Sequence, residues 1–88
     1  MKEITIYSKE VCPYCVKAKS LLQRKKVKFS EIKITDEETK NQMIAKSGGR
    51  MTVPQIFIGD FHVGGCDDLY QLDADGKLND LLAEVEKC

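Results

Sequence analysis

Cys12 and Cys15 stand two residues apart in the segment CPYC. In thiol–disulfide exchange the attacking group is the thiolate, and a free cysteine with a pKa near about 8.5 is mostly protonated at neutral pH. The start of a helix stabilises a thiolate, because unpaired backbone N–H groups and the positive end of the helix dipole lie there. The spacing therefore suits a redox pair in which Cys12 attacks and Cys15 resolves a mixed disulfide.

Two other interpretations of the cysteine pair stay open, half of a zinc site and a structural disulfide. Zinc would need two further ligands at a recognisable spacing, and His62, Cys66 and Cys88 form no second knuckle. A disulfide that closes so short a loop would constrain the unfolded chain little. A CxxC between a strand and a helix favours redox chemistry over both.

The residues on either side of CPYC predict a β-α-β unit. Residues 3–8 (EITIYS) alternate and carry β-branched side chains, which is typical of a strand. Pro13 suits the first turn of a helix, and Ala18, Leu21 and Leu22 follow at helical spacing. Residues 27–34 alternate with period two, and we expect them to form a second strand parallel to the first.

The second half of the chain predicts a helix, a hairpin and two more helices. Asp36 is the candidate N-cap of the first helix, and glycines end it. The Gly59–Asp60 pair suits the turn of an antiparallel hairpin. The expected elements are helix 37–48, strands 53–58 and 61–65, and helices 66–76 and 77–87. The sequence therefore predicts an α/β fold in which helices cover one sheet.

Length and composition limit the number of domains and the classes of protein to which this chain could belong. With 88 residues the chain has room for one modest core, so we expect a single domain over residues 1–88. The formal net charge is zero, which gives no support to a nucleic-acid partner. No stretch approaches the roughly 20 apolar residues of a membrane span, and the N-terminus turns polar too early for a signal peptide. We expect a cytoplasmic protein with no membrane contact.

Three segments together resemble the dithiol glutaredoxins, especially the small bacterial ones. They are CPYC after YSKEV, TVPQIFI at residues 52–58 and GGCDDL at residues 64–69. The resemblance spans essentially the whole chain and implies a thioredoxin-like fold, a four-stranded mixed sheet (βαβ, then ββα) flanked by helices. It also implies a glutathione-dependent thiol-disulfide oxidoreductase that reduces protein disulfides and protein–glutathione mixed disulfides.

The resemblance assigns roles to individual residues. Cys12 is the attacking thiolate that becomes glutathionylated, and Cys15 is the resolving thiol. The Val53–Pro54 bond is expected to be cis, which reverses the chain and turns the Val53 backbone outward. The implied glutathione-binding residues are Lys9, Tyr14, Thr52, Val53, Pro54, Gly65, Cys66 and Asp67. Glutathione is the implied reductant, and no metal is expected.

Each part of glutathione has an expected partner. The Val53 backbone can pair with the cysteinyl unit as a strand would. The free N–H groups of a helix that starts near Gly65 suit the γ-glutamyl carboxylate, and Asp67 suits its ammonium group. Lys9 is expected near the glycyl carboxylate and Tyr14 along the tripeptide. Local alternatives stay open, since Asp67 could serve only as a helix cap and Lys9 only as a solvated lysine.

The remaining candidates are assigned weaker roles. Cys66 is expected to contact ligand through its backbone with its thiol idle, and Arg50 is a second candidate for a carboxylate contact. His62 is expected to be a strand residue without a catalytic task. Cys88, at the chain terminus, is expected to be mobile and a liability for intermolecular disulfides.

Two other functions stay open beside the oxidoreductase. One is an iron–sulfur carrier in which Cys12 of two subunits and two glutathiones hold a cluster. The other is a module that binds thiols without turnover. For the oxidoreductase, protein disulfides are the expected substrates, ribonucleotide reductase is one candidate among them, and a monomer is the expected state.

Overall fold

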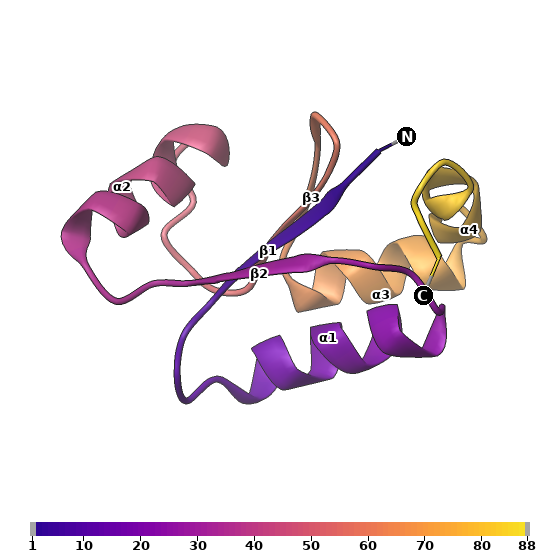
Figure 1. Cartoon of the computed structure of the whole chain (residues 1–88), viewed down its shortest axis with the longest axis horizontal. Helices are drawn as coiled ribbons and strands as arrows, with labels where there is room; N and C mark the ends of the chain where they lie inside the picture. Colours follow the sequence, from indigo (N-terminus) through magenta and orange to yellow (C-terminus); the bar gives the residue numbers. More distant parts are fainter. Residues whose placement is uncertain (1, 88) are drawn as a thin grey trace.

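The computed structural model describes residues 2–87, and within them four strands and four helices form (Figure 1). The strands are β1 (Ile4–Ser8), β2 (Ser30–Lys33), β3 (Gln55–Ile58) and β4 (Phe61–Gly64). The helices are α1 (Pro13–Arg24), α2 (Glu37–Lys46), α3 (Cys66–Ala74) and α4 (Leu78–Leu82). None of these helices, in the described part of the chain, is long and apolar enough to cross a bilayer.

The strands form one mixed sheet in the order β2-β1-β3-β4. β1 and β2 run parallel, and β3 is antiparallel to both β1 and β4. The parallel pair requires a crossover, which α1 supplies, and the turn at Gly59 and Asp60 joins β3 to β4 directly. The expected four-stranded mixed sheet is therefore confirmed.

Alternation along the strands gives the sheet two apolar faces. Ile4 and Ile6 of β1, with Ile56 and Ile58 of β3, pack in the cluster that contains the buried side chains of α1, α3 and α4. The intervening residues point the opposite way, so Tyr7 and Phe57 meet Met43 of α2 in a second cluster. Figure 1 shows the same layers, with α1 and α3 on one side of the sheet and α2 on the other.

Two expected elements are much shorter than the sequence pattern predicts, whereas the other expected ranges differ from the structure by one or two residues. Strand 27–34 contracts to Ser30–Lys33, because Val27 is buried in the core and bridges to Lys87 instead of pairing with β1. Helix 77–87 contracts to Leu78–Leu82, because Val85 reaches the core from a bridge to Lys2. Both prediction errors are at sites where the C-terminal segment pairs with residues far away in the sequence.

A polar network at the sheet edge connects the two ends of the segment that carries the cysteines. Ser8, the last residue of β1, is fully buried, and its hydroxyl donates a hydrogen bond to the Glu31 carboxylate of β2. Lys19 of α1 donates to the same carboxylate oxygen at 2.8 Å. Glu31 therefore connects the strand before the redox pair to the helix after it.

Candidate active site

Cys12 is the N-cap of α1, and Pro13 occupies the first helical position, as the sequence predicts. The backbone N–H of Cys15 donates to the Cys12 Sγ across 3.1 Å. This contact satisfies one of the helix's unpaired N–H groups and points a donor at the sulfur on which a thiolate charge would reside. The sequence context for an activated cysteine is thus present in the structure.

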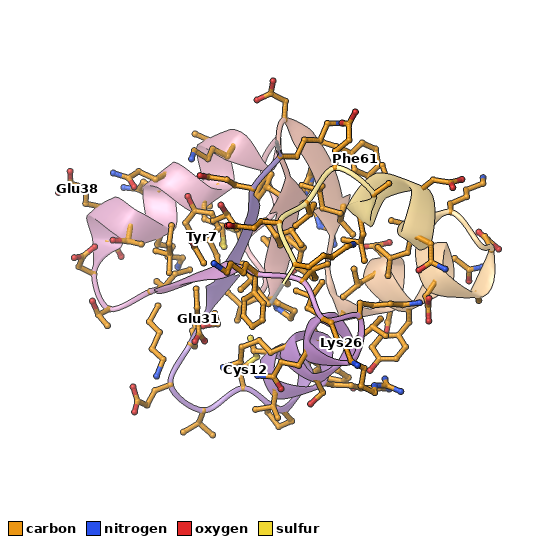
Figure 2. All side chains as sticks on the ribbon, turned by 45° about the vertical axis from the view of Figure 1, so that its right-hand side comes forward. Tyr7, Cys12, Lys26, Glu31, Glu38 and Phe61 are labelled. Carbon is orange, nitrogen blue, oxygen red and sulfur yellow. A yellow bond between two sulfur atoms is a disulfide. The ribbon has the colours of Figure 1, made fainter. Side chains whose placement is uncertain are left out.

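Cys12 and Cys15 form a disulfide, with their Cα atoms 5.2 Å apart. The two sulfurs differ in access, because Cys12 is partly exposed whereas Cys15 is 1% exposed. An incoming substrate can therefore reach Cys12 but not Cys15. Figure 2 shows the sulfur pair at the N-terminal end of α1, where the chain arrives from β1.

A cavity of about 350 Å³ lies between the loop before β3 and the start of α3. Its lining consists of Tyr14, Arg50, Thr52, Val53, Pro54, Gly65, Cys66, Asp67 and Asp68. Seven of the eight residues expected to bind glutathione are in this set. Lys9 is the exception, since it is exposed on the segment before Cys12 and does not line the cavity.

The loop on one side of the cavity contains the expected cis bond between Val53 and Pro54. Thr52 of this loop accepts two hydrogen bonds from the side-chain amide of Gln55, one at its carbonyl (3.0 Å) and one at its hydroxyl (3.2 Å). The Gln55 Oε1 atom lies 2.7 Å from the Nε2 atom of His62, and the His62 ring stacks on Phe57. Gln55 and His62 were not among the predicted site residues, because only the hairpin register brings them together.

On the opposite side of the cavity, Gly65 is the N-cap of α3. The Asp68 carboxylate accepts a hydrogen bond from the Gly65 N–H at 2.9 Å and lies 3.6 Å from the Arg50 guanidinium. Asp68, three residues into the helix, is thus the capping carboxylate, while Asp67 is exposed on the cavity wall. The interpretation of Asp67 as a helix cap is wrong. The spacing of a capping box identifies Asp68 once Gly65 is the N-cap.

Cys66 lies in the first turn of α3 and is 4% exposed. Burial raises the pKa of the Cys66 thiol, and the nearby Lys17 only partly opposes this effect. A protonated thiol is a poor nucleophile, so the environment of Cys66 differs from that of Cys12. Cys88 lies outside the described residues, and between residues 2 and 87 no three or more His, Cys, Asp or Glu side chains gather as a metal site.

A thioredoxin-like sheet with a disulfide-forming CxxC pair at a helix start defines a thiol-disulfide oxidoreductase. Comparison with known proteins identifies the family, since residues 4–63 match the family model described as Glutaredoxin. The chain belongs to the glutaredoxin family.

The similarity to individual glutaredoxins extends over almost the full chain. Over 86 residues the chain is 51% identical to glutaredoxin 1 of Rickettsia prowazekii (strain Madrid E), covering 96% of this chain and 90% of the relative. Over 82 residues it is 54% identical to glutaredoxin 3 of Escherichia coli (strain K12), covering 93% and 99%. The crystal structure of a buckwheat glutaredoxin–glutathione complex matches with a TM-score of 0.84 and 30% identity, covering 94% of this chain and 78% of that chain. The protein is a glutathione-dependent thiol-disulfide oxidoreductase.

Proposed function

We propose that Cys12 is the attacking thiolate of this oxidoreductase and Cys15 the resolving thiol. The observation that carries this assignment is the difference in access between two sulfurs that bond to each other, with Cys12 reachable at the helix start and Cys15 buried. The backbone N–H of Cys15 faces the Cys12 sulfur and favours negative charge on it. This contact also supports Cys12 as the attacking thiolate.

The proposed cycle on a protein–glutathione mixed disulfide uses Cys12 alone. The Cys12 thiolate attacks the glutathione sulfur, the S–S bond breaks, and the protein leaves as its thiolate. A second glutathione thiolate then attacks the glutathione sulfur on Cys12, which yields oxidised glutathione and restores the Cys12 thiolate. Overall one free glutathione thiolate is consumed and one protein thiolate is released, while the disulfide of the substrate is replaced by that of oxidised glutathione.

A protein disulfide requires both cysteines. Cys12 attacks one sulfur of the substrate disulfide and forms a mixed disulfide with the substrate. The Cys15 thiolate then attacks the Cys12 sulfur, which releases the reduced substrate and leaves the Cys12–Cys15 disulfide. Glutathione reopens this bond at Cys12, the more accessible sulfur. Ribonucleotide reductase is one candidate protein substrate.

For glutathione we propose the cavity between residues 52–54 and the start of α3. The Val53 backbone would pair with the cysteinyl unit, the free N–H groups of α3 would bind the γ-glutamyl carboxylate, and Asp67 would bind the ammonium group. Because Asp68 already caps α3 and pairs with Arg50, the exposed Asp67 carboxylate is available for a ligand. The buckwheat glutaredoxin that matches this fold was crystallised with glutathione.

The two ends of the tripeptide have further proposed contacts. Tyr14, 62% exposed on the cavity wall, would lie along glutathione. Arg50 lines the cavity and Lys9 does not, so Arg50 is the nearer of the two cations to this space and Lys9 would approach from the rim. We expect the protein to act as a monomer in the cytoplasm, where the glutathione pool is close in potential to a glutaredoxin dithiol.

The iron–sulfur alternative needs the same Cys12 thiolate as a cluster ligand. The bond between Cys12 and Cys15 favours the oxidoreductase, since it uses the sulfur that a cluster would require.

Trapping the mixed disulfide tests the assignment. We expect Cys15→Ser, incubated with oxidised glutathione, to carry one glutathione on Cys12, as determined by mass spectrometry and peptide mapping. Cys12→Ser is the matched control, and peptide mapping should find no glutathione on its Cys15. An adduct that forms mainly on Cys15 of the Cys12→Ser variant would reverse the two roles.

A further inference from the structure

A hydrogen-bonded chain of three side chains runs from β4 to the cavity wall. His62 contacts the Gln55 Oε1 atom at 2.7 Å, and the Gln55 amide nitrogen contacts both the carbonyl and the hydroxyl of Thr52. Thr52 lines the cavity, whereas Gln55 and His62 do not. The chain therefore connects a residue outside the cavity to the loop that forms one of its walls.

Gln55 is fully buried, so its amide has no water to replace a lost partner. A buried polar group left without a hydrogen bond costs more than the bond itself contributes, because its desolvation is not compensated. Among the described residues every buried side-chain nitrogen and oxygen has a partner, which includes both polar atoms of Gln55. The position of this amide is thus determined by His62 on one side and Thr52 on the other.

The chemistry of the groups fixes the direction of each bond. The Thr52 carbonyl can only accept, so the Gln55 NH₂ group must face Thr52 and its oxygen must face His62. That oxygen can only accept, so His62 must donate from Nε2. Burial lowers the pKa of His62, which favours the neutral ring, and the required tautomer of that ring carries its proton on Nε2. The ring is held in place by stacking on Phe57, with centroids 4.8 Å apart.

We propose that His62 is a positioning residue for glutathione, acting through Gln55 on the Thr52 carbonyl. The donor at His62 fixes the Gln55 amide, and the amide fixes the peptide that precedes Val53, whose backbone is proposed to pair with glutathione. This inference rests on the proposed glutathione cavity. It assigns a role in substrate binding to a histidine that makes no contact with the substrate.

Two substitutions at one position separate the donor from the ring. His62→Phe keeps an aromatic ring against Phe57 and removes the donor, whereas His62→Gln keeps an N–H donor at similar reach and removes the ring. For reduction of a glutathionylated peptide, we expect His62→Phe to raise KM roughly fivefold to tenfold, as for loss of a buried hydrogen bond, with kcat within about twofold of the parent. His62→Gln should restore KM to within about twofold of the parent.

Two controls make the outcomes distinguishable. The free energy of unfolding of each variant, from urea titration, separates a binding defect from a folding defect. Asp67→Asn tests the cavity itself and should raise KM if glutathione binds there. A raised KM in Asp67→Asn with an unchanged KM in His62→Phe would overturn the role of His62 and leave the cavity intact. Unchanged KM values in both variants would overturn the cavity and the inference together.

A measurement on the unsubstituted protein tests the same inference without any change in sequence. The ¹⁵N chemical shifts of the His62 ring should show a neutral tautomer protonated at Nε2, and the Gln55 side-chain NH₂ should exchange slowly with solvent. A raised KM in His62→Gln with an unchanged KM in His62→Phe would show that the ring and not the donor matters, and equally raised KM values in both would show that a donor at this position is not sufficient; either result would contradict the proposal. Protonation of the neutral ring at Nδ1 alone would also contradict the proposal.

Discussion

Gly64 is the residue before the N-cap of α3, and its substitution by alanine should disrupt the start of that helix. Gly64 has φ +111°, a backbone conformation that side-chain-bearing residues rarely adopt. A Cβ atom there would lie 2.9 Å from the Asp68 Cγ and would overlap its carboxylate oxygen. That carboxylate caps Gly65 and pairs with Arg50, so it must move away from both partners.

Two physical effects contribute to the loss of stability in Gly64→Ala. A residue held at a sparsely populated φ costs about 1–3 kcal/mol. Loss of a helix cap costs about 0.5–2 kcal/mol. Together we expect Gly64→Ala to lower the free energy of unfolding by roughly 2–4 kcal/mol, a loss that a domain of ordinary stability survives.

Urea unfolding of Gly64→Ala beside Gly76→Ala measures this effect. Gly76 has φ +75°, and a Cβ there would meet no neighbouring side chain or backbone within 4 Å, so its substitution tests backbone strain without a displaced neighbour. We expect Gly76→Ala to lower the free energy of unfolding by about 1–2 kcal/mol, which is the ordinary cost of alanine in the left-handed backbone conformation. A loss in Gly64→Ala no larger than that in Gly76→Ala would refute the role assigned to Asp68.

Two further predictions concern a charged network and the third cysteine. Hydrogen bonds from Lys19 and Ser8 lower the pKa of the Glu31 carboxyl below its ordinary value, so Glu31 stabilises the fold above that ordinary pKa and loses this contribution as pH falls through its folded-state pKa. The parent protein should therefore exceed Glu31→Gln in urea resistance at neutral pH and approach it in acid; a pH-independent difference would contradict this. Cys66→Ala should keep kcat within about twofold, because burial raises the pKa of the Cys66 thiol and disfavours its thiolate. A large loss of turnover in this variant, with unchanged stability, would show that the thiol takes part in the reaction.

Most of the fold could be predicted because its elements are encoded locally. The isoleucines of β1 and β3 alternate along the chain, and the turn residues between β3 and β4 are adjacent in the sequence. The N-caps of α1 and α2 follow from Cys12 with Pro13 and from Asp36, whose side chain accepts from the Thr39 N–H. These signals depend on neighbouring residues, and the structure confirms them.

The ends of β2 and α4 could not be predicted from local pattern. Val27 and Val85 occur at strand-like and helix-like spacing, yet both are buried through bridges between distant segments. An apolar residue at a given spacing indicates burial, and the element that buries it depends on which parts of the chain meet. Bridges between the ends of the chain are long-range contacts of this kind.

The site was predictable to the extent that its motifs are contiguous. The pairing of Cys12 with Cys15 follows from CPYC, and the resemblance supplied the cis bond at Pro54 and the grouping of these residues. The contact of Gln55 with His62 depends on the register of the β3–β4 hairpin, where Phe57 pairs with His62. The two-residue turn at Gly59 and Asp60 indicates the pairing of Phe57 with His62, but no local spacing indicates that the Gln55 side chain reaches the His62 ring, so this part of the site became visible only in three dimensions.

The central claim is that Cys12 attacks and Cys15 resolves, and turnover by cysteine variants tests it most directly. Reduction of a glutathione mixed disulfide, coupled through glutathione and its reductase to NADPH consumption, should be compared among the parent, Cys12→Ser and Cys15→Ser. We expect Cys12→Ser to be inactive and Cys15→Ser to retain turnover on this substrate, because only Cys12 is needed for it. Activity in Cys12→Ser, or loss of activity in Cys15→Ser with an intact fold, would contradict the assignment.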